Sequence, residues 1–199
     1  MRPAEFSLAT WNVNSIRIRA PLVIEWLKAA GPDVLALQEL KTEAAGFPEE
    51  LFREAGYSAH VHGQKTWNGV ALLSRRELAE VRPGLPGLED DPQARFLSAR
   101  LGDVRLIGVY VPNGAEVGSE PYAYKLRWLD ALCRHFERDL DPAEPLALLG
   151  DFNIAPAERD LHDPEAFRGR VPFSEPERDA FERLLAWGLG ARFPRFEAW

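Results

Sequence analysis

The residues best suited to chemistry follow the apolar run Leu146–Leu149. Gly150 comes next and lets the chain turn, and Asp151 and Asn153 follow at a spacing of two. In an extended segment, that spacing puts a carboxylate and a carboxamide on one face, at the C-terminal end of a buried core strand. Enzymes of the α/β class often hold catalytic groups there. The same residues also suit a plain Asx-turn, so the motif alone leaves its function open.

Three further predicted strands end in polar side chains. Asn12 ends an alternating segment, Glu39 follows the predicted core strand Val34–Gln38, and Tyr110 lies near the end of a predicted hairpin. If these strand ends and the Asp151 motif lie side by side, one pocket holds two carboxylates, two amides and a phenol. The sequence therefore predicts a single polar site built from four separate strands.

Two carboxylates, together with the oxygen atoms of two amides, suit Mg²⁺ or Mn²⁺. These ions bind hard oxygen ligands and keep several water molecules. Such an ion can take a phosphate oxygen as a ligand and neutralise developing charge. A carboxylate beside it can deprotonate a water, which is typically worth ~10²–10⁴-fold in rate. An amide can donate a hydrogen bond to the charged transition state. The predicted site fits phosphodiester hydrolysis without a covalent intermediate.

Strand and helix patterns around these motifs predict a mixed α/β fold. Helices are expected over residues 21–30, with Pro21 in the first position, and over 48–55, 121–140 and 174–187. Further strands are expected over 57–62, 69–74 and 96–101, a loop over 81–93, and no clear element after Phe193. Because helices alternate with strands early and hairpins occupy the middle, a mixed α/β sandwich fits better than a purely parallel sheet.

Composition narrows the class of protein. A chain of 199 residues is typical of one domain. Its net charge of -7 argues mildly against nucleic-acid binding, although an acidic protein can still bind DNA through a local basic groove. The single Cys133 excludes an internal disulfide framework and is expected to be a packed thiol. We find no run long enough to span a bilayer and no signal peptide, so we expect a cytoplasmic protein that does not bind membranes.

The chain resembles the exonuclease III type of abasic-site endonuclease, within the larger endonuclease/exonuclease/phosphatase fold group. Six matching segments occur in the family's order and cover nearly all of the chain: residues 10–17, 37–41, 62–71, 109–114, 150–156 and 173–178. The resemblance implies a four-layer α/β sandwich over residues 1–199, with two mixed sheets face to face and helices outside. It also implies Mg²⁺- or Mn²⁺-dependent cleavage of double-stranded DNA at abasic sites, with trimming of 3′ ends, by a monomer.

The resemblance also assigns roles to individual residues. It makes Glu39 the principal metal ligand, with Asn12 beside it. It makes Asp151 the group that activates water or protonates the leaving group, and Asn153 the group that orients water, both near the metal. Tyr110 would contact the scissile phosphate. It places DNA contacts on Gln64, Lys65, Asn68, Arg95 and Asn113, and it puts Gln93 with Arg95 in a loop near DNA. It leaves Trp67 open between a core side chain and a stacking platform.

The family's pattern continues with an aromatic stretch, an Arg-Ile-Asp segment and a closing Ser-Asp-His, and this sequence contains none of them. We therefore expect an incomplete family domain with part of its catalytic shell, an uncovered sheet edge and weakened activity. Two alternatives stay open. One is another phosphoesterase of the same fold group, acting on a nucleotide, phospholipid or inositol phosphate. The other is a non-enzyme, either a degenerate DNA-binding remnant or a fragment with no activity of its own.

Overall fold

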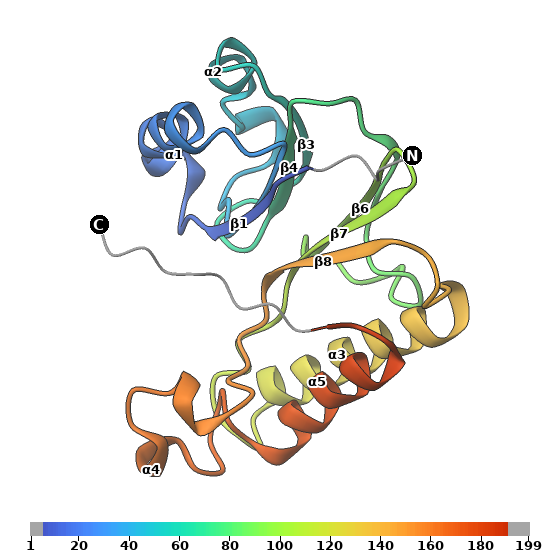
Figure 1. Cartoon of the computed structure of the whole chain (residues 1–199). Coiled ribbons are helices and arrows are strands. Elements are labelled where there is room, and N and C mark those ends of the chain that lie inside the picture. The colour runs from blue at the N-terminus through green and yellow to red at the C-terminus, as the bar shows by residue number, and fades with distance from the viewer. Residues whose placement is uncertain (1–5, 191–199) are drawn as a thin grey trace. The chain divides into compact units, whose positions relative to one another are not determined.

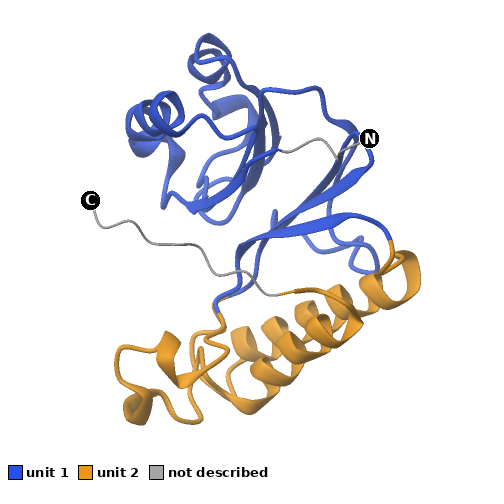
Figure 2. Ribbon diagram, in the orientation of Figure 1, with its two compact units in different colours: residues 1–112, 144–153 blue, residues 113–143, 154–199 orange. Residues whose placement is uncertain are grey.

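The computed structural model describes residues 6–190, which fall into two compact units (Figure 2). The first unit combines residues 1–112 with 144–153, and the second combines 113–143 with 154–199. The single domain expected over the whole chain stays a prediction. The segment after Phe193, where no element is predicted, lies outside the described residues.

The first unit contains two four-stranded sheets (Figure 1). In spatial order, the first sheet consists of β1 (Leu8–Asn12), β2 (Val34–Gln38), β4 (Val70–Ser74) and β3 (Ser58–His62). The second consists of β5 (Ala79–Pro83), β6 (Phe96–Leu101), β7 (Val104–Tyr110) and β8 (Leu146–Asp151). Each sheet has one parallel pair, β1–β2 and β7–β8, and its other pairs are antiparallel. The predicted mixed sheets are confirmed.

The alternating side chains of β2 explain how the sheets stack. Val34 and Ala36 point to an apolar cluster that they share with Leu97 of β6 and Leu106 of β7, so the two sheets lie face to face. Leu35 and Leu37 on the other face of β2 pack into a second cluster. That second cluster includes residues of α1 (Ile16–Ala30) and α2 (Glu49–Glu54), which cover the outer face of the first sheet.

Helix α1 differs from its prediction. It starts at Ile16 instead of Pro21, and Pro21 lies exposed inside it. Its buried face is formed by Ile16, Ala20, Val23 and Leu27, whereas Leu22 is exposed. The earlier start has a tertiary cause, because the backbone N–H groups of residues 15 and 16 donate to the carbonyl oxygens of residues 39 and 40. These bonds satisfy donors that a helix N-terminus leaves unpaired.

Two other expectations for the first unit need correction. Residues 81–83 are not loop but belong to β5, whose pairing with β6 shifts register between Ala79 and Arg82. The run Leu146–Leu149 does form a strand, but β8 is half-buried along its length and not fully buried. The reason is its position, because β8 is an outer strand of its sheet and pairs with β7 alone among the described strands.

Gly150 lies within β8, so close packing and not a sharp turn explains the glycine. A Cβ atom at this position would lie 2.0 Å from the carbonyl oxygen of Val109, its partner residue on β7. We expect Gly150→Ala to lower the free energy of unfolding by about 1–3 kcal/mol, as overpacking of a core does. Urea unfolding checks this, with Gly190→Ala as the control, because no heavy atom lies within 4 Å of a Cβ built there. Equal stability of the two variants would contradict the close approach.

The second unit is built on two helices, α3 (Glu120–Asp139) and α5 (Glu175–Trp187). Both match their predicted ranges to within one residue, and the predicted capping box of Ser174 and Glu177 is present. A 3₁₀ turn, η2 (Glu158–Asp160), and the short helix α4 (Pro164–Phe167) lie between them. Cys133 of α3 is buried, as expected, and burial raises the pKa of its thiol to about 11. Within residues 6–190, no helix is long and apolar enough to cross a bilayer.

Candidate active site

Four strands of the first unit end in the polar residues that the sequence singled out. Asn12 is the last residue of β1, and Glu39 comes directly after β2. Tyr110 and Asp151 are the last residues of β7 and β8, and they pair with each other in register. Strands β1 and β2 run parallel to each other, and so do β7 and β8. The carboxyl ends of each pair therefore lie at the same edge of their sheet.

Side-chain hydrogen bonds join these ends across the two sheets. The Nδ2 group of Asn12 donates to Glu39 Oε1 at 2.7 Å and to Asp151 Oδ2 at 2.8 Å. The Tyr110 hydroxyl donates to the same Glu39 Oε1 at 2.9 Å. The two carboxylates therefore share one amide group, and the phenol closes the set. The structure brings together the four strand ends that were expected to form one pocket.

Asp151 uses its two oxygens differently. Oδ1 accepts the backbone N–H of Asn153 at 2.9 Å, which is the Asx-turn, while Oδ2 faces Asn12. Both sequence interpretations of Asp151 thus hold, one for each oxygen. The extended segment expected after Asp151 is wrong, because Asn153 has a left-handed backbone with φ of 48° and its Nδ2 donates to the carbonyl oxygen of Val111. Asn153, which follows β8 in the sequence, is thus hydrogen-bonded to the residue that follows β7.

The charges at this site are set by competing effects. Burial opposes ionisation of Glu39, but hydrogen bonds from Asn12, Lys41 and Tyr110 outweigh it and lower the pKa of the carboxyl group. Burial, together with the hydrogen bond to Glu39, raises the pKa of Tyr110 to about 12. An ionised carboxylate and a neutral phenol therefore coexist at neutral pH.

Backbone strain gathers around the same residues. Positive φ angles are found at Asn14 (43°), Glu39 (56°), Lys41 (54°) and Asn153 (48°), none of which is glycine. Such conformations cost of order 1–3 kcal/mol each and persist where surrounding structure holds them, often at functional sites. The segment carrying Glu39 is held in this way, because the N–H groups of residues 40 and 41 donate to the carbonyl oxygens of residues 69 and 68.

Four residues expected near DNA form an internal brace. Asn68 Nδ2 donates to Gln64 Oε1 at 3.0 Å and to Gln93 Oε1 at 3.1 Å. Arg95 donates to Gln93 Oε1 at 2.8 Å and to the Tyr110 carbonyl oxygen at 3.1 Å, and its guanidinium lies 4.8 Å from the Tyr110 ring centroid. Asn68 and Arg95 are buried. This network positions Tyr110, and direct DNA contacts of its members stay a prediction.

The remaining expected DNA contacts are in different surroundings. Lys65 is exposed, and Trp67 is 65% exposed, so Trp67 is not a core side chain. Asn113 belongs to the second unit, where its side chain is exposed and its carbonyl oxygen accepts a hydrogen bond from Lys125. For all three residues, contact with DNA stays a prediction.

The donor set fits a hard divalent ion. Glu39 and Asp151 supply two carboxylates. Glu39 Oε1 and Asp151 Oδ2 are close to each other, because both accept hydrogen bonds from the same nitrogen, Asn12 Nδ2, at 2.7 and 2.8 Å. No group of three or more His, Cys, Asp or Glu side chains that could hold a metal occurs within residues 6–190. Two carboxylates suit an ion such as Mg²⁺, which takes few protein ligands and keeps water and substrate oxygens as the others. Asn12 faces both carboxylates with its nitrogen, so direct ligation by its oxygen requires the amide to turn.

One residue of the site had no role assigned from the sequence. Lys41 Nζ lies 3.0 Å from Glu39 Oε2, on the opposite carboxylate oxygen from Asn12 and Tyr110. The available signal was a cation two residues after a carboxylate at a strand end.

The raised pKa of Tyr110 predicts a pH-dependent stability. A phenol whose pKa is higher in the folded state than its ordinary value of 10 contributes stability that is complete below pH 10 and disappears as the pH rises towards 12. The wild type should therefore lose stability between pH 10 and pH 12, and Tyr110→Phe should lose less. We expect the two losses in unfolding free energy to differ by about 1 kcal/mol, a value reduced for the solvent screening of this half-exposed group. Urea titrations below pH 10 and near pH 12 measure this, and parallel pH profiles for the two proteins would contradict it.

The fold and site together define an α/β-sandwich protein whose polar strand ends from two stacked sheets form one candidate hydrolytic site. The chain belongs to the Endonuclease/Exonuclease/phosphatase family, which it matches over residues 9–199. The resemblance seen in the sequence is thereby confirmed.

Named relatives refine this assignment. The chain is 31% identical to exodeoxyribonuclease III of Haemophilus influenzae, over 92% of this chain and 73% of that protein. Among solved structures it is similar to the Neisseria 3′ phosphatase NExo bound to product DNA hairpin, with 42% identity, a TM-score of 0.88 and coverage of 92% and 71%. It is also similar to an AP endonuclease from Archaeoglobus fulgidus, with 38% identity, a TM-score of 0.88 and coverage of 92% and 70%. The chain thus spans about 70% of the length of these relatives.

Proposed function

We propose that this chain is a divalent-metal-dependent DNA phosphodiester hydrolase of DNA repair, acting in the cytoplasm on double-stranded DNA at abasic sites and 3′ ends. The observation that carries the proposal is the pairing of Glu39 and Asp151 through the Asn12 amide, where strands of both sheets end. The names of the relatives, an exodeoxyribonuclease III, a 3′ phosphatase and an AP endonuclease, support DNA as the substrate class.

Mg²⁺ or Mn²⁺ is the proposed cofactor. When bound, such an ion neutralises negative charge on a phosphate oxygen. Glu39 is its principal ligand in this proposal, because its carboxylate lies between the other polar groups of the site, in contact with Asn12, Tyr110 and Lys41. Asp151 and Asn12 are joined to Glu39 by hydrogen bonds and are proposed as further ligands. Asn153, whose backbone N–H is bonded to Asp151, is proposed as the fourth residue of the metal site.

Proton transfer and charge stabilisation fall to other side chains. Asp151 Oδ2, on the site side of its carboxylate, accepts the proton of the attacking water, a role worth ~10²–10⁴-fold in rate. Tyr110 stays protonated, with a pKa of about 12, and in this proposal its hydroxyl hydrogen turns from Glu39 Oε1 to a phosphate oxygen when the substrate binds. Asn153 orients the water from the turn that its own N–H makes with Asp151.

DNA is favoured over a small phosphoester by the loops beside the site. Lys65 and Trp67 project exposed from the loop that Gln64 and Asn68 hold in place. A cation and an aromatic ring are the groups that bind a phosphate backbone and stack on a base. With a net charge of -7, the chain depends on such local features for DNA binding.

The test uses the purified chain with Mg²⁺, Mn²⁺ or EDTA on three substrates: a duplex with one abasic site, a duplex with a recessed 3′ end, and bis-p-nitrophenyl phosphate. We expect metal-dependent cleavage of the two duplexes that disappears with EDTA and in Glu39→Ala. The matched control is Glu25→Ala, which removes an exposed carboxylate of α1. Cleavage of the small diester alone would indicate a different phosphoesterase. Absence of cleavage with every metal and substrate would overturn the proposal.

A further inference from the structure

The side chain of Lys41 lies against Glu39 in the candidate site. Its Nζ is 3.0 Å from Glu39 Oε2 and donates a hydrogen bond to Asn14 Oδ1. The same ammonium lies 5.8 Å from the centroid of the exposed Trp67 ring. The side chain is 25% exposed, so the charge is neither buried nor free in solvent.

The two oxygens of Glu39 are divided between neutral and charged donors. Oε1 accepts hydrogen bonds from Asn12 and Tyr110, which fill both of its lone pairs. Oε2 faces the Lys41 ammonium. An incoming divalent ion that binds this carboxylate at its usual distance of about 2.0–2.1 Å must therefore meet either two neutral donors or one cation.

This arrangement is built into the backbone and is not a chance surface ion pair. Glu39 and Lys41 both have left-handed φ angles, 56° and 54°, which side chains rarely adopt. The N–H of Lys41 donates to the Asn68 carbonyl oxygen at 2.9 Å, which fixes the turn that brings the two side chains together. A strained turn that is held in place so that a lysine lies on a candidate metal ligand points to a role for that lysine.

We propose that Lys41 is a resident cation that occupies the Glu39 carboxylate in the metal-free protein and competes with the divalent ion for it. The inference rests on the proposed function, because it takes Glu39 as a metal ligand. Binding of the ion displaces the ammonium from Oε2, since the two positive charges repel each other at contact distance. The displaced lysine, on its flexible four-carbon stem, becomes available to a phosphate group of the substrate.

The proposal links metal binding to DNA binding. A phosphate that takes up the Lys41 ammonium removes the competitor from Glu39, so substrate strengthens metal binding, and by reciprocity metal strengthens substrate binding. Removal of the lysine charge should tighten metal binding to the DNA-free protein. It should also abolish the mutual strengthening of metal and DNA binding that depends on Lys41. Activity alone does not separate these effects, so metal affinity is the quantity to measure.

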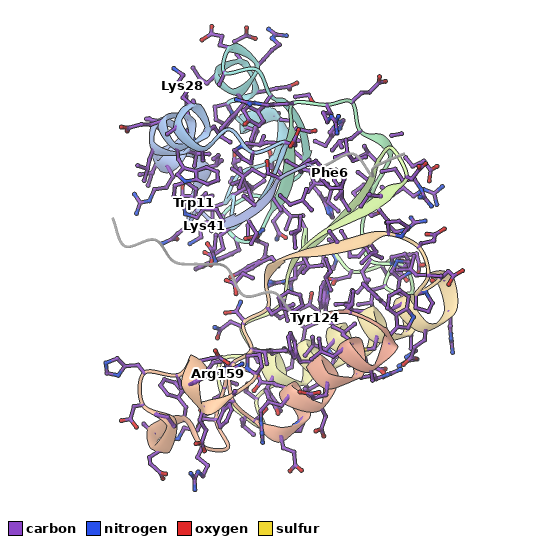
Figure 3. The ribbon with its side chains drawn as sticks, viewed as in Figure 1. Phe6, Trp11, Lys28, Lys41, Tyr124 and Arg159 are labelled. Atoms are coloured by element: carbon purple, nitrogen blue, oxygen red, sulfur yellow. The ribbon has the colours of Figure 1, made fainter. Side chains whose placement is uncertain are left out.

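The experiment measures Mn²⁺ binding to the DNA-free protein at low ionic strength, from the electron paramagnetic resonance signal of the unbound ion. We expect Lys41→Met to bind Mn²⁺ about tenfold more tightly than the wild type, because one adjacent positive charge is lost. Lys41→Arg keeps the charge and should stay near the wild-type affinity. Lys28→Met is the matched control, because Lys28 is exposed on α1 and lies away from Lys41 (Figure 3). Lys41→Gln repeats the test with a polar neutral side chain.

Two further variants separate failure of this inference from failure of the proposed function. If wild-type Mn²⁺ binding disappears in Glu39→Ala but is unchanged or weaker in both Lys41→Met and Lys41→Gln, the competition by Lys41 is refuted and Glu39 remains a metal ligand. If Mn²⁺ binding is the same in the wild type, Glu39→Ala and Asp151→Ala, the metal site itself is wrong and the proposed function fails with it.

Discussion

Asp151→Asn should slow cleavage of an abasic duplex by about 10²–10⁴-fold, the range lost when a general base is removed. The substitution keeps the size and shape of the side chain but removes its charge and its basicity. One of its two acceptor oxygens becomes an NH₂ group, so either the Asn153 N–H or the Asn12 Nδ2 group loses its partner. The reaction is affected by lost chemistry and by a disturbed bridge to Glu39.

Single-turnover rates at saturating Mg²⁺ measure this effect without interference from product release. Asp103→Asn is the matched control, because it makes the same change at an exposed residue of the turn between β6 and β7, in the same unit. We expect the control to cleave at the wild-type rate. A rate for Asp151→Asn within threefold of the control would show that Asp151 does not handle the proton in the proposed reaction.

The strand ends were predictable because the relevant signals are local. A buried strand with both faces covered reads as a continuous apolar run, and β2 has that pattern and that burial. The apolar run ends at Leu37, and the polar residues Gln38 and Glu39 that follow it mark the end of the strand. The capping box that starts α5 is equally local, since Ser174 and Glu177 are three residues apart.

The parts that could not be predicted depend on contacts between distant segments. The hydrogen bond from Asn12 to Asp151 joins residues 139 positions apart, and no local pattern indicates which amide meets which carboxylate. Arg95 reads as a surface cation in the sequence but is buried, because Gln93 and the Tyr110 carbonyl oxygen accept its N–H groups. Helix α1 begins early for the same kind of reason, since its first donors bind the segment after β2.

No pattern in the sequence indicated a role for Lys125 of α3. We expect its substitution to have the largest effect on the free energy of unfolding. Its ammonium forms a fully buried ion pair with Glu177 of α5 and donates to the Asn113 carbonyl oxygen at 3.1 Å. The other oxygen of Glu177 accepts from the N–H and hydroxyl groups of Ser174. Because the hydroxyl of Ser174 also contacts Tyr122, the pair belongs to a buried polar network that connects the two helices.

Lys125→Met should lower the free energy of unfolding by about 3–5 kcal/mol, the cost of leaving one partner of a buried ion pair without the other. Among the described residues, the Lys125 ammonium is the one polar group in contact with Glu177 Oε1. Urea unfolding measures the change. The control is Arg134→Met, which breaks the exposed pair of Arg134 and Asp130 on the same helix and should cost about 0–1 kcal/mol.

The double variant Lys125→Met/Glu177→Gln decides whether charge or packing causes the loss. If the stranded carboxylate is responsible, neutralising Glu177 restores part of the stability, and the double variant is more stable than the sum of the single changes predicts. If lost packing is responsible, the two effects add. Packing has a specific component here, because Lys125 Cδ lies 2.9 Å from the position of a Cβ on Gly114. We expect the charge to dominate, since methionine retains most of the length and apolar volume of the lysine stem while the uncompensated carboxylate stays buried.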